Sequence, residues 1–77
     1  MNLQDRMLGA LRHQGQLVTV FLTNGFQMRG IIRGFDSFVV ILECDGRQQM
    51  IYKHAISTLV PQHRVDLYAS WEEHAAE

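Results

Sequence analysis

Two short turn sequences, Asn24-Gly25 and Asp45-Gly46, constrain the fold of this chain more than any other feature. Asn24-Gly25 follows residues 17–23, which are rich in β-branched and aromatic side chains, and Asp45-Gly46 follows the apolar run 38–43. Because asparagine or aspartate followed by glycine favours the tight turn between two antiparallel strands, each dipeptide predicts a β-hairpin. The second hairpin would return along residues 47–52, so we expect a mainly β fold.

The first hairpin also predicts which side chains share a face of the sheet. If its loop contains only the Asn-Gly dipeptide, Thr23 pairs with Phe26 and Phe21 pairs with Met28, and Thr19 lies on the same face. The opposite face then carries Val18, Val20 and Leu22. Because both faces are partly apolar, two interpretations stay open: Phe21 and Met28 are ordinary core residues, or they belong to an exposed platform on which bases stack.

The remaining elements follow from capping and breaking residues. Asn2 is suited to cap a helix, and the apolar spacing that follows predicts a helix over residues 3–13 that ends near Gly15. Gly30 and Gly34 interrupt the long second strand, and glycine within a strand pattern marks a bend or a bulge. The second strand is therefore expected to bend sharply.

A break in the chain is expected at Lys53-His54, before a fifth strand over residues 55–60 that Pro61 ends. Consecutive strand residues point to opposite faces, so Lys53 and His54 can reach one ligand only if the strand stops between them. One helix and five short strands suit a closed or partly closed small barrel. We expect one domain over residues 1–61, followed by a short, weakly ordered tail over residues 62–77.

Length, charge and cysteine content narrow the class of protein further. The chain has 77 residues, a net charge of −1 and a single cysteine, Cys44, which excludes an internal disulfide. The four histidines are too far apart for a zinc motif, and we expect neither a metal nor a cofactor. A domain this small buries little of its surface, which leaves oligomerisation as its means of stabilisation. The sequence shows no signal peptide or membrane-spanning pattern, and we expect a cytoplasmic protein with no membrane association.

Several of these motifs together resemble a known family. The residues concerned are Leu3-Gln4-Asp5, Asn24-Gly25, Gly30, Phe35-Asp36-Ser37-Phe38 and Tyr52-Lys53-His54-Ala55-Ile56-Ser57-Thr58. In this order and spacing, they make residues 2–61 similar to the bacterial Sm-like family Hfq, and closer to its Gram-positive branch. The resemblance implies a Sm-like (LSm) fold, in which an N-terminal α-helix lies on a strongly bent five-stranded antiparallel sheet that forms an open small barrel. It also implies a homohexameric ring, formed by strand pairing, that acts as an RNA chaperone on small regulatory RNAs and messenger RNAs.

The resemblance further implies two RNA-binding faces and a rim. The proximal face, expected to bind uridine-rich RNA, comprises Gln4, Asp5, Phe38, Tyr52, Lys53 and His54. The distal face, expected to bind adenine-rich RNA, comprises Phe21, Gly25, Phe26, Gln27, Met28, Arg29, Gln49 and Thr58. The rim comprises Arg12 and Phe35, and carries fewer cations than in well-studied relatives. Asp5 has two readings, either as an anion that offsets the helix dipole or as a residue that orients the proximal site.

Two other functions compete with RNA binding. The near-neutral charge would also suit a structural Sm-like barrel that mediates protein contacts with little RNA annealing activity. An enzyme would use His54 as a general base beside Lys53, with Asp36 or Asp45 to orient it. The sequence contains no activated nucleophile, phosphate loop or metal-ligand spacing, and we therefore do not expect an enzyme.

Overall fold

Helix α1 (Leu3–Gln14) begins where the sequence predicts and ends one residue later. In the computed structural model, which describes residues 2–68, the side-chain oxygen of Asn2 accepts a hydrogen bond from the Asp5 N–H (2.8 Å). Gly15 ends the helix in a left-handed conformation (φ 64°), and its N–H donates to the Leu11 carbonyl. These two caps satisfy backbone groups that a helix leaves unpaired at its ends.

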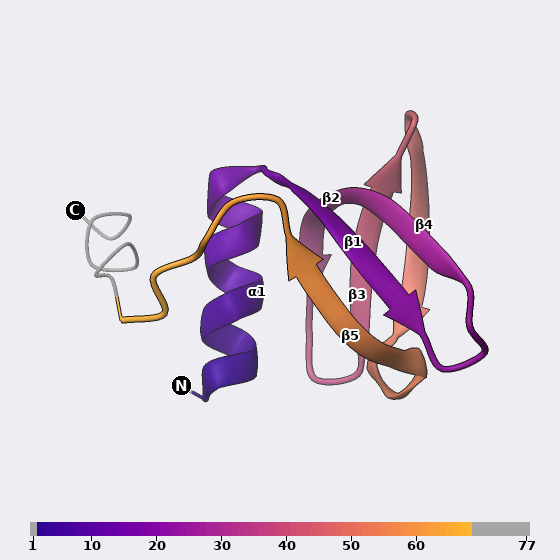
Figure 1. Cartoon of the computed structure of the whole chain (residues 1–77), viewed down its shortest axis with the longest axis horizontal. Helices are drawn as coiled ribbons and strands as arrows, with labels where there is room; N and C mark the ends of the chain where they lie inside the picture. The colour runs from indigo at the N-terminus through magenta and orange to yellow at the C-terminus, as the bar shows by residue number, and fades with distance from the viewer. Residues whose placement is uncertain (1, 69–77) are drawn as a thin grey trace.

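The helix is followed by five strands that form one antiparallel sheet (Figure 1). The strands are β1 (Leu17–Leu22), β2 (Gln27–Phe35), β3 (Val39–Cys44), β4 (Arg47–Tyr52) and β5 (Ile56–Pro61). Their order across the sheet is β4-β3-β2-β1-β5, so β4 and β5 are its two edges. A 3-10 helix, η1 (Lys53–Ala55), separates β4 from β5, which confirms the expected break at Lys53-His54.

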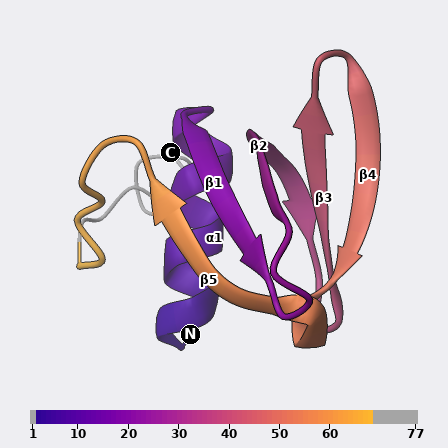
Figure 2. The same cartoon turned by 45° about the vertical axis from the view of Figure 1, so that its right-hand side comes forward.

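The core lies between α1 and the concave side of the bent sheet (Figure 2). Leu8 and Leu11 of the helix pack there against one side of every strand from β1 to β4. Its fully buried side chains are Leu11, Val18, Val20, Ile32, Val40 and Leu42. The pairing of β2 with β3 shifts register between Ile32 and Gly34, and this irregularity bends the long strand near the predicted position.

The first hairpin has a different register from the predicted one. Phe21 pairs with Gln27 and Val20 pairs with Met28, so both expected pairs are wrong by one residue. The cause is the loop, which has three residues because the Leu22 N–H bonds to the Phe26 carbonyl (2.8 Å). A one-residue shift exchanges the faces of a strand, so Met28 joins the core side while Phe21 stays exposed.

The segment that follows β5, residues 62–68, lies along α1 rather than leaving the domain. The Gln16 side chain accepts from the His63 N–H (2.7 Å) and donates to the His63 carbonyl (3.1 Å). Further along, Val65 packs against the core. Residues 69–77 of the predicted tail lie outside the described residues. No helix in residues 2–68 is long and apolar enough to cross a membrane.

Candidate nucleic-acid interface

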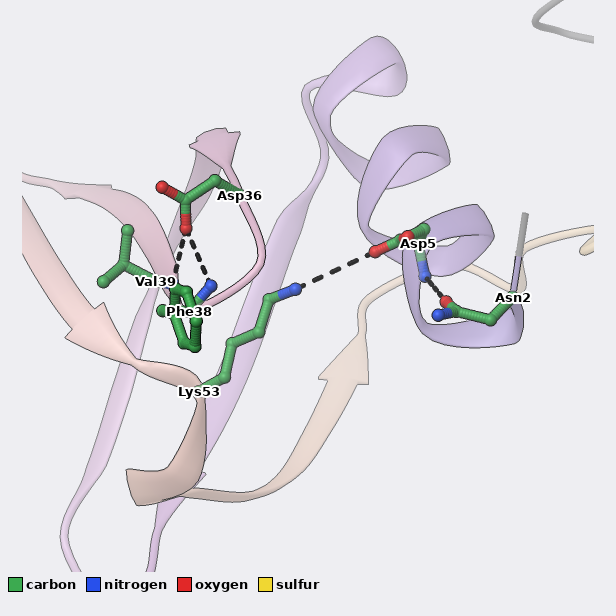
Figure 3. Close-up of polar contacts among 6 residues, drawn as sticks. All are labelled: Asn2, Asp5, Asp36, Phe38, Val39 and Lys53. Carbon is green, nitrogen blue, oxygen red and sulfur yellow. Dashed lines mark hydrogen bonds and ion pairs between the residues drawn. The ribbon is translucent and has the colours of Figure 1, made fainter.

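The start of α1 and the η1 turn meet through Lys53 (Figure 3). The Lys53 ammonium lies 3.8 Å from an Asp5 carboxylate oxygen, and only 11% of the lysine side chain is exposed. Because Asn2 caps the Asp5 N–H, the carboxylate sits in the first turn of the helix, where anions are favoured. The same carboxylate is therefore placed to offset the helix dipole and to pair with Lys53, and its role in an RNA site stays a prediction.

Phe38 is presented beside this ion pair by the turn between β2 and β3. Its side chain is 75% exposed, yet both of its backbone polar groups are bonded. The Asp36 carboxylate accepts from the N–H groups of Phe38 (2.8 Å) and Val39 (2.9 Å), and the Lys53 N–H donates to the Phe38 carbonyl (2.8 Å). These two N–H groups, with a smaller effect from the charge of Lys53, lower the pKa of Asp36. Asp36 thus stays ionised at neutral pH.

The other predicted proximal residues lie around the same point. Gln4, Lys53, Ser57 and Thr58 are the polar residues that line a cavity of about 210 Å³, whose apolar lining comes from α1, β3 and β5. The rings of Tyr52 and His54 stack with centroids 5.4 Å apart, and both residues are exposed. The structure therefore brings together Gln4, Asp5 and Lys53, and a backbone bond joins Phe38 to Lys53. Tyr52 and His54 flank Lys53 in the chain and stack on each other.

The predicted rim residues connect to this cluster through one ring. Phe35 lies at the end of β2 and packs against the core. The Arg12 guanidinium and the Lys53 ammonium lie 5.8 Å and 5.7 Å from the centre of its ring, within the range of a cation–π contact. The rim cation and the proximal cation thus share one aromatic partner.

A second surface lies on the convex side of β1, β2 and β5. Cross-strand pairing places Phe21 between Gln27 and Thr58, and Thr19 between Arg29 and Val60. A hollow of about 600 Å³ is lined by Thr19, Phe21, Gln27, Arg29 and Val60. Phe26 follows the hairpin loop directly and is 71% exposed, with its N–H bonded to the Asn24 side chain (3.0 Å). Gly25 gives this loop its positive φ of 94°.

Not all of the predicted distal residues reach this convex surface. Phe21, Gln27, Arg29 and Thr58 share it. Phe26 pairs with Leu22 next to the Gly25 loop, so the register puts it on the Met28 side of its strand and not, as was expected, on the Phe21 side. Met28 points to the core side, and Gln49 does too, because it pairs with the buried Leu42 on β3. The expectation that Met28 shares a face with Phe21 is therefore wrong for the single chain. Within one chain, Gln49 and Phe21 also lie on opposite faces of the sheet.

Several residues of these two surfaces were not among the predicted site residues, including Ser57 in the proximal cavity. On the convex surface they are Thr19 and Val60, and beside Lys53 they are Asn2 and Asp36. The alternation of β5 contains the signal for Val60, since it lies two residues after Thr58 and must share its face. The signal for Asp36 is an aspartate that begins a turn and can accept bonds from N–H groups two and three residues ahead. Within residues 2–68, no group of three or more His, Cys, Asp or Glu side chains could hold a metal ion.

The chain is similar to one protein family over most of its length. A family model described as Hfq protein matches residues 3–66. An RNA-binding protein Hfq from Anoxybacillus flavithermus is 61% identical over 66 residues, which cover 86% of this chain and 89% of the relative. One from Moorella thermoacetica is 57% identical over 68 residues, which cover 88% of this chain and 81% of the relative.

Solved structures of Hfq proteins share the fold of this chain. A crystal structure described as the pleiotropic translational regulator Hfq matches with a TM-score of 0.75 and 49% sequence identity, over 77% of this chain and 98% of that one. A crystal structure of an Hfq protein from Anabaena sp. matches with a TM-score of 0.71 and 32% identity, over 77% of this chain and 95% of that one. The helix and the five antiparallel strands therefore form the predicted Sm-like fold.

Proposed function

This chain belongs to the Hfq family, and we propose that it is an RNA chaperone that binds single-stranded uridine-rich and adenine-rich RNA. The observation that carries the proposal is the proximal cluster, in which an exposed Phe38 lies beside the Lys53–Asp5 ion pair. Aromatic rings stack on any base, and single strands offer their bases for this contact. The names of the relatives, RNA-binding protein Hfq, support the same class of ligand.

At the proximal face, each residue has a role that suits its chemistry. Phe38 stacks on a base, while the Gln4 amide, which both donates and accepts, bonds to the uracil edge. Lys53 bonds to the base edge or to a phosphate, and His54 lies near the phosphates. Asp5 is an anion and does not contact RNA, but it holds the Lys53 ammonium 3.8 Å away. Tyr52 stacks on His54 and fixes the aromatic wall of the site.

At the distal face, the exposed rings of Phe21 and Phe26 stack on adenine bases. The Gln27 amide suits the adenine edge, Thr58 offers a hydroxyl, and Arg29 suits a phosphate. Gly25 lets the backbone turn close to the ligand. Because Met28 and Gln49 face the core side of their own chain, a direct contact from Gln49 on edge strand β4 requires a neighbouring subunit to bring it to the site.

The proposed assembly is a homohexameric ring in which β4 of one subunit pairs with β5 of the next. Both are edge strands of the described sheet, and unpaired edges favour association with another chain. A ring would gather six copies of Lys53 into one cationic surface, although each chain has a net charge of −1. Arg12 and Phe35 would form a weakly cationic rim. We propose that such a ring acts in the cytoplasm, without catalysis, on small regulatory RNAs and messenger RNAs.

The test measures binding of fluorescent uridine-rich and adenine-rich oligonucleotides to the full chain and to two variants. Lys53→Ala should weaken uridine-rich binding at least about tenfold and leave adenine-rich binding within about twofold, with the reverse for Phe26→Ala. Each variant is thus the control for the other. Equal affinity of wild type and both variants for both RNAs would overturn the assignment of the two faces.

A further inference from the structure

Asp36 forms the turn that carries Phe38, and its carboxylate makes most of the hydrogen bonds there. One carboxylate oxygen accepts from two consecutive N–H groups, those of Phe38 (2.8 Å) and Val39 (2.9 Å). The Asp36 N–H donates in turn to the Val39 carbonyl (3.0 Å). Removal of the carboxylate would leave this last bond as the one hydrogen bond of Asp36 within the turn.

These contacts determine where the Phe38 ring can be. Since 75% of the residue is exposed, packing contributes little to the position of the ring. Its backbone is held at both ends instead, by Asp36 at the N–H and by the Lys53 N–H at the carbonyl. Figure 3 shows the ring between the Asp36 carboxylate and the Lys53 side chain. Because the backbone that carries the ring is already ordered, only the side-chain torsions of Phe38 remain to be fixed when a base stacks on it, so binding costs less.

We infer that Asp36 is a positioning residue for base stacking on Phe38, an inference that rests on the proposed binding of uridine-rich RNA. The charge of Asp36 acts against binding, because an ionised carboxylate beside an RNA site repels phosphates. Positioning therefore requires that the gain from the acceptor, which closes the turn, is larger than this repulsion. Asp36 acts through Phe38 and does not contact the RNA.

The two effects of Asp36 have opposite signs, and two substitutions separate them. Asp36→Ala removes both the charge and the acceptor, whereas Asp36→Asn removes the charge and keeps an oxygen that can accept from the same N–H groups. Repulsion alone predicts that both variants bind uridine-rich RNA more tightly than wild type. Positioning predicts that Asp36→Ala binds about tenfold more weakly, while Asp36→Asn stays within about twofold of wild type or binds more tightly.

The direct experiment is a double-mutant cycle on the full chain with a uridine-rich oligonucleotide. If Asp36 acts through Phe38, adding Asp36→Ala to Phe38→Ala should cause no further loss of affinity. Hydrogen exchange at the Phe38 and Val39 amides should be faster in Asp36→Ala and close to wild type in Asp36→Asn. Binding of adenine-rich RNA and the mass from light scattering should stay unchanged in both single variants.

Three results would overturn the inference: tighter uridine-rich binding by Asp36→Ala, an additive loss in the double variant, or equal losses for both RNAs. The last would mean that the carboxylate supports the fold in general. A failure of the proposed function is distinguishable, because wild type would then not bind uridine-rich RNA and Phe38→Ala would change nothing.

Discussion

Gly30 is the residue at which the close packing of β2 against β3 depends most directly on a missing side chain. It lies on β2 and is buried against the end of β3. A Cβ atom at this position would lie 2.8 Å from the Cys44 sulfur and closer still to the Glu43 carbonyl oxygen. Gly34 differs, because a Cβ there would have only the Ile41 side chain nearby, at 4.0 Å. Of the two glycines predicted to bend the strand, Gly30 is the one that sterics require.

Gly30→Ala should therefore destabilise the domain by about 2 kcal/mol or more, since the clash is with backbone and cannot be relieved by a side-chain rotation. Gly34→Ala is the matched control and should change stability by less than about 1 kcal/mol. Urea unfolding at a fixed protein concentration measures both, because association adds to apparent stability. Equal unfolding midpoints for the two variants would contradict the steric argument.

At the scale of elements, the two hairpins show which features of a turn the sequence predicts and which it does not. Asp45-Gly46 forms the predicted two-residue loop, with φ values of 50° and 78° that match the favoured hairpin turn. Asn24-Gly25 instead belongs to a three-residue loop, because the Asn24 side chain accepts from the Phe26 N–H and only Gly25 has a positive φ. The dipeptides alone do not distinguish these loops, and the difference determines the face of Met28.

Contacts between elements that are distant in the sequence could not be predicted from periodicity or turn signals. Asp5 and Lys53 meet only because α1 packs over the sheet, and the spacing of the residues along the chain does not reveal this. The resemblance to the family did place Asp5 and Lys53 in the same site, because it carries over the site positions of relatives and needs no knowledge of the contact. Helix caps, strand order along the chain and the break before β5 depend on local signals and could be predicted.

The strap, residues 62–68, is held at its start by the Gln62 N–H, which donates to the Leu17 carbonyl (3.0 Å), and by the Gln16 side chain. Gln16 makes both hydrogen bonds to the His63 backbone (2.7 and 3.1 Å). Gln16→Ala should open the strap without unfolding the domain, and should speed tryptic cleavage after Arg64 by about 5- to 30-fold for two lost bonds of about 1 kcal/mol each. Gln14→Ala is the control, because it removes only the bond between the two glutamines. Mass spectrometry identifies the cleaved bond, and equal rates in both variants would contradict the clamp.

At the scale of the whole molecule, the chain leaves an apolar strip on an open edge of its sheet. Met50 on β4 is 57% exposed and Tyr52 follows it on the same face. Their partners across the strand pair, Ile41 and Val39, are also apolar and only partly buried. An edge strand with such a face invites pairing with another copy, and the opposite edge, β5, is available for it. In the proposed ring, both edge strands, β4 and β5, would be paired with neighbouring subunits.

Light scattering on the full chain should accordingly give a mass about six times the 8.9 kDa of one chain. Met50→Lys should shift the protein to smaller species, because the ring would bury the new charge without a partner. Gln48→Lys adds the same charge to the same face two residues away, opposite Glu43, and should leave the mass unchanged. The loss of the ring should also weaken uridine-rich binding, since the six Lys53 side chains would no longer form one surface. A wild-type monomer at micromolar concentration would reject the ring, and an intact ring in Met50→Lys would place the subunit contact elsewhere.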